Sequence, residues 1–419
     1  MKKIIEPVPY VLGDARLVIE YGEQGINDIR LESMSRTGIE EVVKGRMIEL
    51  LPSITPYICI EDSWSHYHAT IKALEEIYSR KPPIIAIGLR RTGHLLEIAE
   101  HHIHHLAFQT LPLYTGSPLK EAYIVLEEIT SIKKIIGGKQ IAPAYSVPGG
   151  VTKKPTGEEL EKLVNLAKKT VDDLEKLANI LEERLMSSQA YVEKISQQYG
   201  IETVQVAVID EDGAPGYYDG RLVVMENGKT NSITINDFLE ELSHTNVPWS
   251  HTPLLTYKDK PVLTGPLARF NTASLPPPIE SLEKIVEEHG RPVVNPHIAE
   301  LVRIAEIKYI AEKLREAYEE PGWLEGEALD LSGKLGRKGF GVVESARGLI
   351  VHGYSIDEKR LVTGYVYVTP SQLNYTYLHR ALEVFKGRDF SEEAMRTILS
   401  LTASLDLCIE EASIHGLGR

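Results

Sequence analysis

The stretch that decides the interpretation of this sequence is Tyr57-Ile58-Cys59-Ile60-Glu61-Asp62-Ser63-Trp64-Ser65-His66, because its pattern returns near the other end of the chain. The second copy is Asp406-Leu407-Cys408-Ile409-Glu410-Glu411, followed by His415. In each copy a carboxylate comes three residues after a cysteine and a histidine comes seven residues after it. Since these are the only two cysteines, we predict that both segments belong to one site.

The repeated residue types point to a metal site. Positions i, i+3 and i+7 share one face of a helix, so the three side chains of each copy are expected to project together. Thiolate, carboxylate and imidazole groups are the protein ligands that first-row transition metals use most. One Cys-x-x-Asp is usually a buried cysteine beside a surface acid, but the repetition favours a shared function. The predicted metal ligands are Cys59, Asp62, Cys408, Glu411 and His415.

Composition describes an ordinary globular chain and excludes several classes of protein. The 419 residues are 42% hydrophobic and 25% charged. A net charge of −14 argues against nucleic-acid binding. There is no run of 18 apolar residues and no apolar signal segment after Met1, so we expect a cytoplasmic protein that does not span a membrane.

Hydrophobic periodicity in the first half predicts mostly helices. Alternation over residues 15–32 predicts a β hairpin, and a helical period follows from about 38 to 50. The first signature continues as helix to Ile77, before Lys81-Pro82-Pro83. A second helix is expected over 84–111. Thr156-Gly157-Glu158-Glu159 resembles a capping box for a helix to Tyr199, about 60 Å long.

The second half mixes strands and helices. Residues 202–235 are strand-like, 279–318 helical, and 340–352 with 365–368 form strands. Two final helices follow, with the second signature on the last. We therefore predict an α+β, mainly α fold built as a long-helix bundle with small peripheral β-sheets. It is expected to be one domain over 1–419, with a bundle core at 38–199 and 279–419 and a β-rich insert at 202–275.

Other motifs carry less information. The histidine group His101, His102, His104 and His105 lies on one predicted helix, where a structural or solvated role is expected. Gly339-Phe340-Gly341 lacks the further glycines of a dinucleotide-binding loop. The chain has no cysteine-rich iron–sulfur run, so any iron–sulfur cluster is expected in another subunit.

Taken together, the motifs resemble the large subunit of the nickel–iron hydrogenases over nearly the whole chain. The family's first motif, Arg-x-Cys-Gly-x-Cys-x-x-x-His before a helix ending Ala-Leu-Glu, is similar to residues 57–66 and 73–75. Its second, Asp-Pro-Cys-x-x-Cys, is similar to residues 406–411. The remaining similar stretches are Arg36-Thr37-Gly38-Ile39-Glu40, Gly45-Arg46, Val147-Pro148-Gly149-Gly150-Val151, and Glu344-Ser345-Ala346-Arg347-Gly348 with His352.

The departures from the family pattern fall on the metal ligands. The resemblance implies that Cys59 and Cys408 hold the places of terminal nickel ligands, whereas Asp62 and Glu411 replace the two cysteines that bridge nickel and iron. An acidic family residue that helps with magnesium and protons falls on Leu12. His415 also lies four residues after the last ligand position, where the family has three.

The resemblance implies a function in a redox complex. We expect the large subunit of a hydrogenase-like oxidoreductase complex with a remodelled metal site of two cysteines and two carboxylates. Carboxylates are hard donors, so iron, zinc or manganese is more compatible than a nickel–iron pair. The expected catalytic residues are Arg347, His66 and Glu344. The expected partner is an iron–sulfur small subunit of the hydrogenase type, within a larger hetero-oligomer.

Two alternatives remain open at this point. Arg347 can pair with Asp62 or Glu411 and leave the site without metal, as in the related quinone-site subunit of respiratory complex I. The chain would then be a coupling or scaffold subunit, in which Asp62, Glu411, His66 and His415 move protons or bind a quinone-like molecule. The second alternative is a genuine dihydrogen-activating hydrogenase despite the substitutions.

Overall fold

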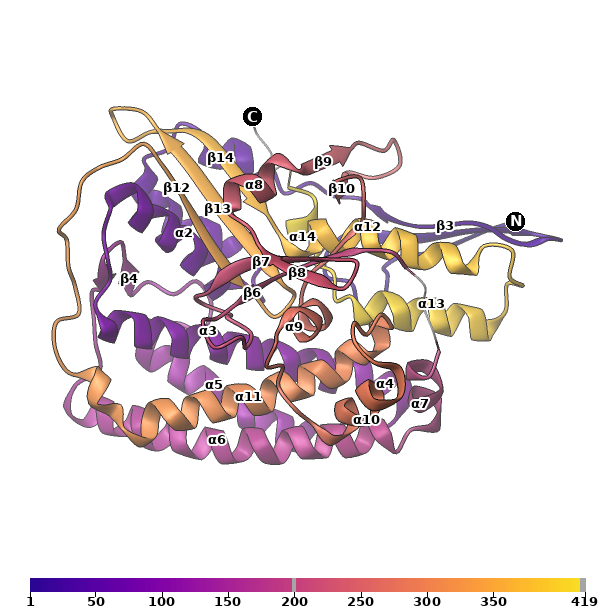
Figure 1. Ribbon diagram of the computed structural model, residues 1–419, viewed down its shortest axis with the longest axis horizontal. Coiled ribbons are helices and arrows are strands. Elements are labelled where there is room, and N and C mark those ends of the chain that lie inside the picture. Colours follow the sequence, from indigo (N-terminus) through magenta and orange to yellow (C-terminus); the bar gives the residue numbers. More distant parts are fainter. Residues whose placement is uncertain (198–200, 415–419) are drawn as a thin grey trace.

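The computed structural model describes residues 1–197 and 201–414 and has the predicted α+β, mainly helical fold (Figure 1). Its helices are α1 Ile39–Val43, α2 Ser63–Tyr78, α3 Ile84–His104, α4 Leu111–Tyr114, α5 Leu119–Gly137, α6 Gly157–Met186, α7 Gln189–Ile195, α8 Ile235–Glu240, α9 Pro266–Thr272, α10 Glu280–His289, α11 Ala299–Glu319, α12 Pro370–Leu382, α13 Glu392–Ser404 and α14 Ile409–Ala412. A π-helical turn, His105–Thr110, joins α3 to α4.

Five small sheets surround the helices. The first has the order β1-β2-β3 and contains the predicted hairpin, the second has the order β11-β6-β7-β8, and the third has the order β12-β13-β14. Two further sheets are the pairs β4-β5 and β9-β10. The strands are β1 Lys2–Ile5, β2 Ala15–Gly22, β3 Gly25–Ser33, β4 Ser146–Val147, β5 Gly150–Val151, β6 Val204–Ile209, β7 Arg221–Glu226, β8 Lys229–Ser232, β9 Leu242–Thr245, β10 Leu254–Tyr257, β11 Val262–Leu263, β12 Lys338–Glu344, β13 Leu349–Ile356 and β14 Val362–Val368.

Four long helices form the bundle. Figure 1 shows α3, α5, α6 and α11 side by side along one edge of the molecule, and neighbouring members of this set pack on one another. On α6 the buried residues recur at helical spacing, for example Leu163, Ala167, Leu174 and Leu181. This apolar stripe explains why α6 packs against α5 and α11 while its charged face remains in solvent.

Helix α2 connects the bundle to the β12-β13-β14 sheet. Its Trp64 is fully buried and donates from Nε1 to the carbonyl of Gln140 at 2.7 Å. On the opposite side, Gly341 of β12 lies against the backbone of α2, and a Cβ at this position would sit 1.8 Å from the carbonyl oxygen of Ala69. The missing side chain lets the strand lie directly on the helix, which fixes the end of β12 that leads to Arg347.

Several predicted boundaries are wrong. The helix expected to reach Tyr199 ends at Met186, because Ser188 adopts an extended conformation and starts α7. Thr156 is the capping residue of α6, but its side chain makes no capping hydrogen bond. The helix expected over 38–50 is the short α1 followed by the 3₁₀ segment Ile48–Ser53.

One large apolar cluster links distant parts of the chain. Its buried members extend from Val8 to Ile409. Within residues 1–197 and 201–414 no helix is long and apolar enough to cross a membrane. A single domain with a β-rich insert at 202–275 remains the prediction made from the sequence.

Candidate metal centre

The two signature segments converge at one buried point. Cys59 follows the 3₁₀ turn Thr55–Tyr57, and Asp62 is the capping residue at the start of α2. Cys408 is the capping residue of α14, and Glu411 lies within that short helix. All four side chains are buried, and ligand atoms of Cys59, Asp62 and Glu411 lie within 4.8 Å of one another. The predicted convergence is observed, but the helix-face explanation is wrong because both cysteines precede their helices.

The N-terminal segment holds the second signature in place. The amide of Leu12 donates to the carbonyl of Leu407 at 3.0 Å, and the amide of Ile409 donates to the carbonyl of Leu12 at 2.7 Å. These bonds form a parallel bridge opposite Cys408. The hydroxyl of Thr37 adds a bond to the carbonyl of Glu410. Segments from both ends of the chain therefore determine where the Cys408 thiol lies.

The turn between β12 and β13 carries Arg347 into this centre. Gly348 has a φ of +135°, and a Cβ there would lie 2.6 Å from the amide nitrogen of Gly265. This close approach requires glycine. The carbonyls of Ser345 and Ala346 accept hydrogen bonds of 3.0 Å from the buried Arg269. These two bonds hold the turn in place.

Arg347 is the cation of the centre. Its Nη1 lies 2.8 Å from Asp62 Oδ2 and 3.6 Å from Cys59 Sγ, and its Nη2 is paired with Glu61. Its Nε donates to the carbonyl of Asp406 at 2.7 Å. Burial alone would raise the pKa of Asp62, but the charges of Arg347 and His101 outweigh it and lower this pKa.

Both thiols are buried, and the thiol of Cys408 donates to Glu410 Oε2 at 3.3 Å. The influence of Cys408 and the charge of Arg347 lower the pKa of Cys59, but burial and the nearby Asp62 and Glu411 carboxylates outweigh them, so that pKa is raised. Burial, together with the influence of Cys59, raises the pKa of Cys408 well above its usual value. In the absence of a bound cation the thiols are therefore protonated.

Glu411 is held by a chain of polar side chains. Ser371 donates to its Oε1, and His66 Nε2 lies 3.3 Å from its Oε2. His66 Nδ1 is 3.0 Å from Nε2 of His352, whose Nδ1 lies 2.8 Å from the hydroxyl of Thr70. The predicted residue His66 thus orients Glu411, and His352 orients His66.

Two further predicted residues lie elsewhere. Glu344 accepts from Arg269 Nη1 at 2.5 Å and from the amide of Val208 at 2.8 Å, so its carboxylate belongs to a different network. Its expected catalytic role therefore gains no support from its contacts. His415 lies outside the described residues, so its predicted place among the ligands stays a prediction.

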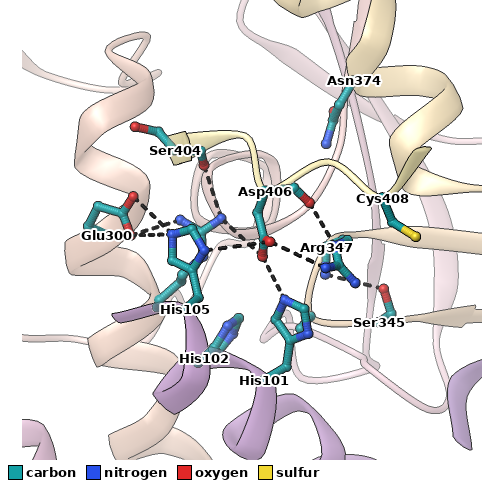
Figure 2. Close-up of polar contacts among 12 residues, drawn as sticks. His101, His102, His105, Glu300, Ser345, Arg347, Asn374, Ser404, Asp406 and Cys408 are labelled. Carbon is teal, nitrogen blue, oxygen red and sulfur yellow. Dashed lines mark hydrogen bonds and ion pairs between the residues drawn. The ribbon is translucent and has the colours of Figure 1, made fainter. Parts of the chain in front are cut away.

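The histidine group is structural in the main, as expected, and two members, His101 and His105, reach Asp406 beside the centre. His101 Nε2 lies 2.6 Å from Asp406, a residue that also binds Arg347 (Figure 2). Burial lowers the pKa of His101, but the charge and hydrogen bond of Asp406 outweigh it and raise this pKa. His102 is buried against Glu306, and His105 is buried between Glu300 and Asp406, whereas His104 is exposed.

Three important neighbours were missed by reasoning from the sequence. Asp406 accepts from Arg347 and contacts His101, and Ser371 bonds to both Glu411 and the amide of Cys408. Asp406 had a signal, because it stands two residues before Cys408 in the second signature. Ser371 had none, since a serine early in a helix is ordinary.

Comparison with known proteins agrees with this architecture. No family model matches the chain. One polypeptide of the vhu F420-non-reducing hydrogenase of Methanocaldococcus jannaschii is 24% identical over 413 residues, covering 91% of this chain and 98% of that protein. The beta polypeptide of the NAD-reducing hydrogenase HoxS of Cupriavidus necator is 24% identical over 470 residues, covering 100% and 95%.

Solved hydrogenase structures share the fold from end to end. An NAD⁺-reducing nickel–iron hydrogenase in the H2-reduced state superposes with a TM-score of 0.85 at 21% identity, covering 99% of each chain. The Ni-Fe-Se hydrogenase from D. vulgaris Hildenborough gives 0.80 at 16% identity, covering 99% and 100%. The chain has the fold of the nickel–iron hydrogenase large subunit and is similar in sequence to hydrogenase polypeptides over nearly its whole length.

The donor set of this hydrogenase-like subunit does not fit the nickel–iron group that the family implies. Carboxylates stand where the family has its two bridging thiolates, and they are harder and less electron-rich donors. Asp62 is already paired through one oxygen with Arg347, and its other oxygen, Oδ1, is buried without a hydrogen-bond partner. The residues present are two thiols and two carboxylates, which suit a single divalent ion better than a thiolate-bridged pair.

Proposed function

We propose that this chain is the large subunit of a hydrogenase-like oxidoreductase complex whose buried centre binds a transition metal ion of the iron, zinc or manganese class. The observation that carries the proposal is the unpartnered Oδ1 of Asp62. Buried polar atoms without a partner are rare in native proteins, and a buried carboxylate oxygen is the most costly kind. A cation bound beside it would satisfy that oxygen.

The surrounding atoms are the right ones for such a cation. Cys59 and Glu411 have ligand atoms within 4.8 Å of Asp62, and the buried Cys408 lies three residues before Glu411. A bound divalent ion would keep both thiols deprotonated and so offset the burial that favours their neutral forms. Two sulfur and two oxygen donors complete a four-coordinate site.

The chain's own residues would orient these donors. Arg347 holds the other oxygen of Asp62, and Ser371 and His66 hold the two oxygens of Glu411. Such hydrogen bonds to ligating groups set their direction and basicity. We assign Arg347 and His66 to the chemistry of the centre, Arg347 as a fixed positive charge and His66 as the group that holds a proton at Nε2 beside Glu411. Glu344 is left out of this assignment.

An iron–sulfur small subunit is the proposed partner. The relatives are named as subunits of hydrogenases, which supports an assembly of several chains. Next to the buried Cys59, the side chains of Tyr57 and Ile60 are 62% and 54% exposed. Apolar side chains exposed beside a buried redox centre are expected where a partner docks.

Metal analysis of the purified chain tests the proposal. The protein is purified without chelator, and bound metals are measured by plasma mass spectrometry. About one transition metal ion per chain is expected, falling to background in Cys59→Ser and Cys408→Ser. As a matched control, Asp219→Asn changes a carboxylate that pairs with Lys72 and Arg91, so metal content should not change. Stoichiometric nickel together with iron would contradict the proposal.

A second function is favoured by one specific contact. The 2.8 Å pair of Arg347 with Asp62 already neutralises one predicted ligand, as in a metal-free coupling subunit. Absence of stoichiometric metal from the chain in its assembled complex, with full retention of complex activity in Cys59→Ser, would favour this alternative. A dihydrogen-oxidation assay with a viologen acceptor tests the remaining one, a genuine hydrogenase.

A further inference from the structure

The first turn of α2 is capped by a residue from another helix. Glu97 lies on α3 and is buried. Its Oε1 accepts from the amide of Trp64 at 2.6 Å, and its Oε2 accepts from the amide and the hydroxyl of Ser65 at 2.8 and 2.6 Å. Trp64 and Ser65 are the second and third residues of α2, and the amides at the start of a helix have no partner within it. One carboxylate from α3 therefore satisfies two of these amides.

These amides are the ones that the residue before a helix normally binds. A capping aspartate usually has an extended backbone, and its side chain accepts from the second or third amide of the helix. Asp62 has the capping position of α2, yet its side chain makes no capping hydrogen bond and its ψ is 27°. Elsewhere in the chain, Thr369 and Ser391 cap α12 and α13 in the usual way, with ψ values of 154° and 169°.

The carboxylate of Asp62 lies in the centre instead. Its Oδ2 is 2.8 Å from Arg347 Nη1, and its Oδ1 has no hydrogen-bond partner. Cys59 and Glu411 have ligand atoms within 4.8 Å of a carboxylate oxygen of Asp62. A carboxylate folded back over the first turn of α2 would lose its place among these groups. Glu97 removes this competition because it already occupies both amides.

A carboxylate is electrostatically suited to this position. Helix α2 has 16 residues, and the positive end of its dipole favours a negative charge at its first turn. Burial raises the pKa of Glu97 to about 7, although the charge of Lys133 and the hydrogen bonds from Ser65 and Trp64 lower it. The carboxylate form of Glu97 therefore predominates at pH 8.

We propose that Glu97 is a positioning residue for the centre: it caps α2 in place of Asp62 and so leaves the Asp62 carboxylate free to bind a cation. The effect on cation binding rests on the proposed function, whereas the exchange of one cap for the other does not. Without the Glu97 carboxylate, Asp62 is expected to rotate to an extended conformation, cap α2 itself and leave Arg347.

Zinc affinity of the full chain at pH 8 tests the effect on the centre. Glu97→Leu removes both acceptor oxygens, and Glu97→Gln, which keeps one, is the milder change if the first variant does not fold. Competition with a chromophoric chelator should show a dissociation constant for Zn²⁺ raised about tenfold. Glu100→Gln is the matched control, because Glu100 is a buried carboxylate of the same helix that pairs with Lys133 and not with α2. Its zinc affinity should equal that of the parent.

A double-mutant cycle in a chelator tests the exchange of caps without any metal. The shift of the urea midpoint caused by Asp62→Ala should be larger in the Glu97 variant than in the parent, because only in the variant does Asp62 cap the helix. In the Glu100→Gln background the shift should equal that in the parent. A Glu97 with a merely structural role would give additive shifts. A crystal structure of Glu97→Gln should place the Asp62 carboxylate on the amide of Trp64 or Ser65.

Each contrary result has a distinct meaning. If the parent binds zinc and the folded Glu97 variants bind it equally well, Glu97 does not position the centre. Additive midpoint shifts, with Asp62 still paired to Arg347 in the variant crystal structure, overturn the exchange of caps. If the parent binds no zinc, the proposed metal centre fails, while a larger shift of Asp62→Ala in the Glu97 variant still supports Glu97 as the substitute cap.

Discussion

Two buried charged networks lie on either side of the β12–β13 turn, and they differ in completeness. On one side, Arg269 uses all five of its N–H groups, on both oxygens of Glu306, on Glu344 and on two carbonyls of the turn. On the other side, Arg347 binds Asp62, but Asp62 Oδ1 has no partner and the Cys59 thiol lies near it.

This difference in hydrogen bonding gives the Arg269 network a structural role and the Arg347 network a binding role. A fully paired buried network rigidifies a structure, whereas a partly satisfied one is costly unless something else binds. The Arg269 network fixes the turn through the carbonyls of Ser345 and Ala346, and the turn in turn aims Arg347 at the centre. We therefore expect mutations in the first network to lower stability, and mutations in the second to change what the centre binds.

The largest expected effect comes from Arg269→Met. Removing this cation leaves Glu306 and Glu344 buried without their main partner, so the free energy of unfolding should fall by about 3–5 kcal/mol. Chemical denaturation monitored by circular dichroism measures it. In the control Arg315→Met, the exposed pair with Glu175 is lost and the change should stay below about 1 kcal/mol. Equal losses in the two variants would remove the distinction between them.

The pH dependence of stability that arises in the Arg269 network gives the next largest effect. Burial outweighs the charge of Arg269 and raises the pKa of Glu344 to about 7, so the folded state retains this proton at a higher pH than the unfolded state. The resulting stabilisation is complete below the ordinary value of 4.5 and is lost as the pH rises through about 7. Its full size is on the order of 3 kcal/mol.

Glu344→Gln should abolish that slope. Unfolding free energies measured at pH 5, 6 and 7 should fall with rising pH more steeply in the parent than in the variant. Glu312→Gln, which changes an exposed residue of α11, should retain the parent slope. Parallel curves for Glu344→Gln and the parent protein would show that Glu344 is ionised in the folded state throughout this range.

The substitution Arg347→Met tests the second network, in which Arg347 pairs with Asp62. Its carboxylate partner Glu61 has a side chain 32% exposed, so water can replace part of the lost interaction. We expect a loss of about 1–3 kcal/mol in a chelator. With Zn²⁺ present the loss should shrink, because the ion compensates Asp62. Thermal unfolding in both buffers measures this, and a loss independent of metal would favour the metal-free alternative.

Ser371→Ala should give the smallest change in stability and a specific change in binding. It removes the hydroxyl that donates to Glu411 and accepts from the amide of Cys408. The dissociation constant for Zn²⁺ should rise about tenfold, while stability falls by about 1 kcal/mol. Competition with a chromophoric chelator measures the affinity. The exposed Ser332→Ala is the control, and equal affinities in the two variants would argue against Glu411 as a ligand.

Local sequence signals predicted those elements whose periodicity is uninterrupted. The hairpin at 15–32 is β2 and β3, and the helix predicted over 84–111 begins at Ile84 as α3. The long helix was overextended, because its apolar pattern continues across Ser187 and Ser188 although the backbone turns there. Serine side chains bond readily to the backbone in non-helical conformations, and periodicity does not record this.

The centre was predicted by residue type but not by contact. Cys59, Asp62, Cys408 and Glu411 stood out because thiols and carboxylates at a repeated spacing are rare. Their assumed helical face was wrong, since Cys59 precedes α2 and Cys408 precedes α14. The network around Arg269 could not be predicted from the sequence. An arginine and two glutamates at unrelated spacings have no pattern until the fold brings them together.

By itself, the sequence determined the donor atoms of the centre and the elements that carry them, because both depend on residue identity and local periodicity. Only the tertiary structure decided which partners those atoms have: that Arg347 pairs with Asp62, that Cys59 lies near Asp62 and Glu411, and that Asp62 Oδ1 is left without a donor. The physical reason is that a buried charge or thiol is governed by its nearest neighbours. Here these neighbours come from distant segments that only the packing of α2, α14 and the β12–β13 turn brings together.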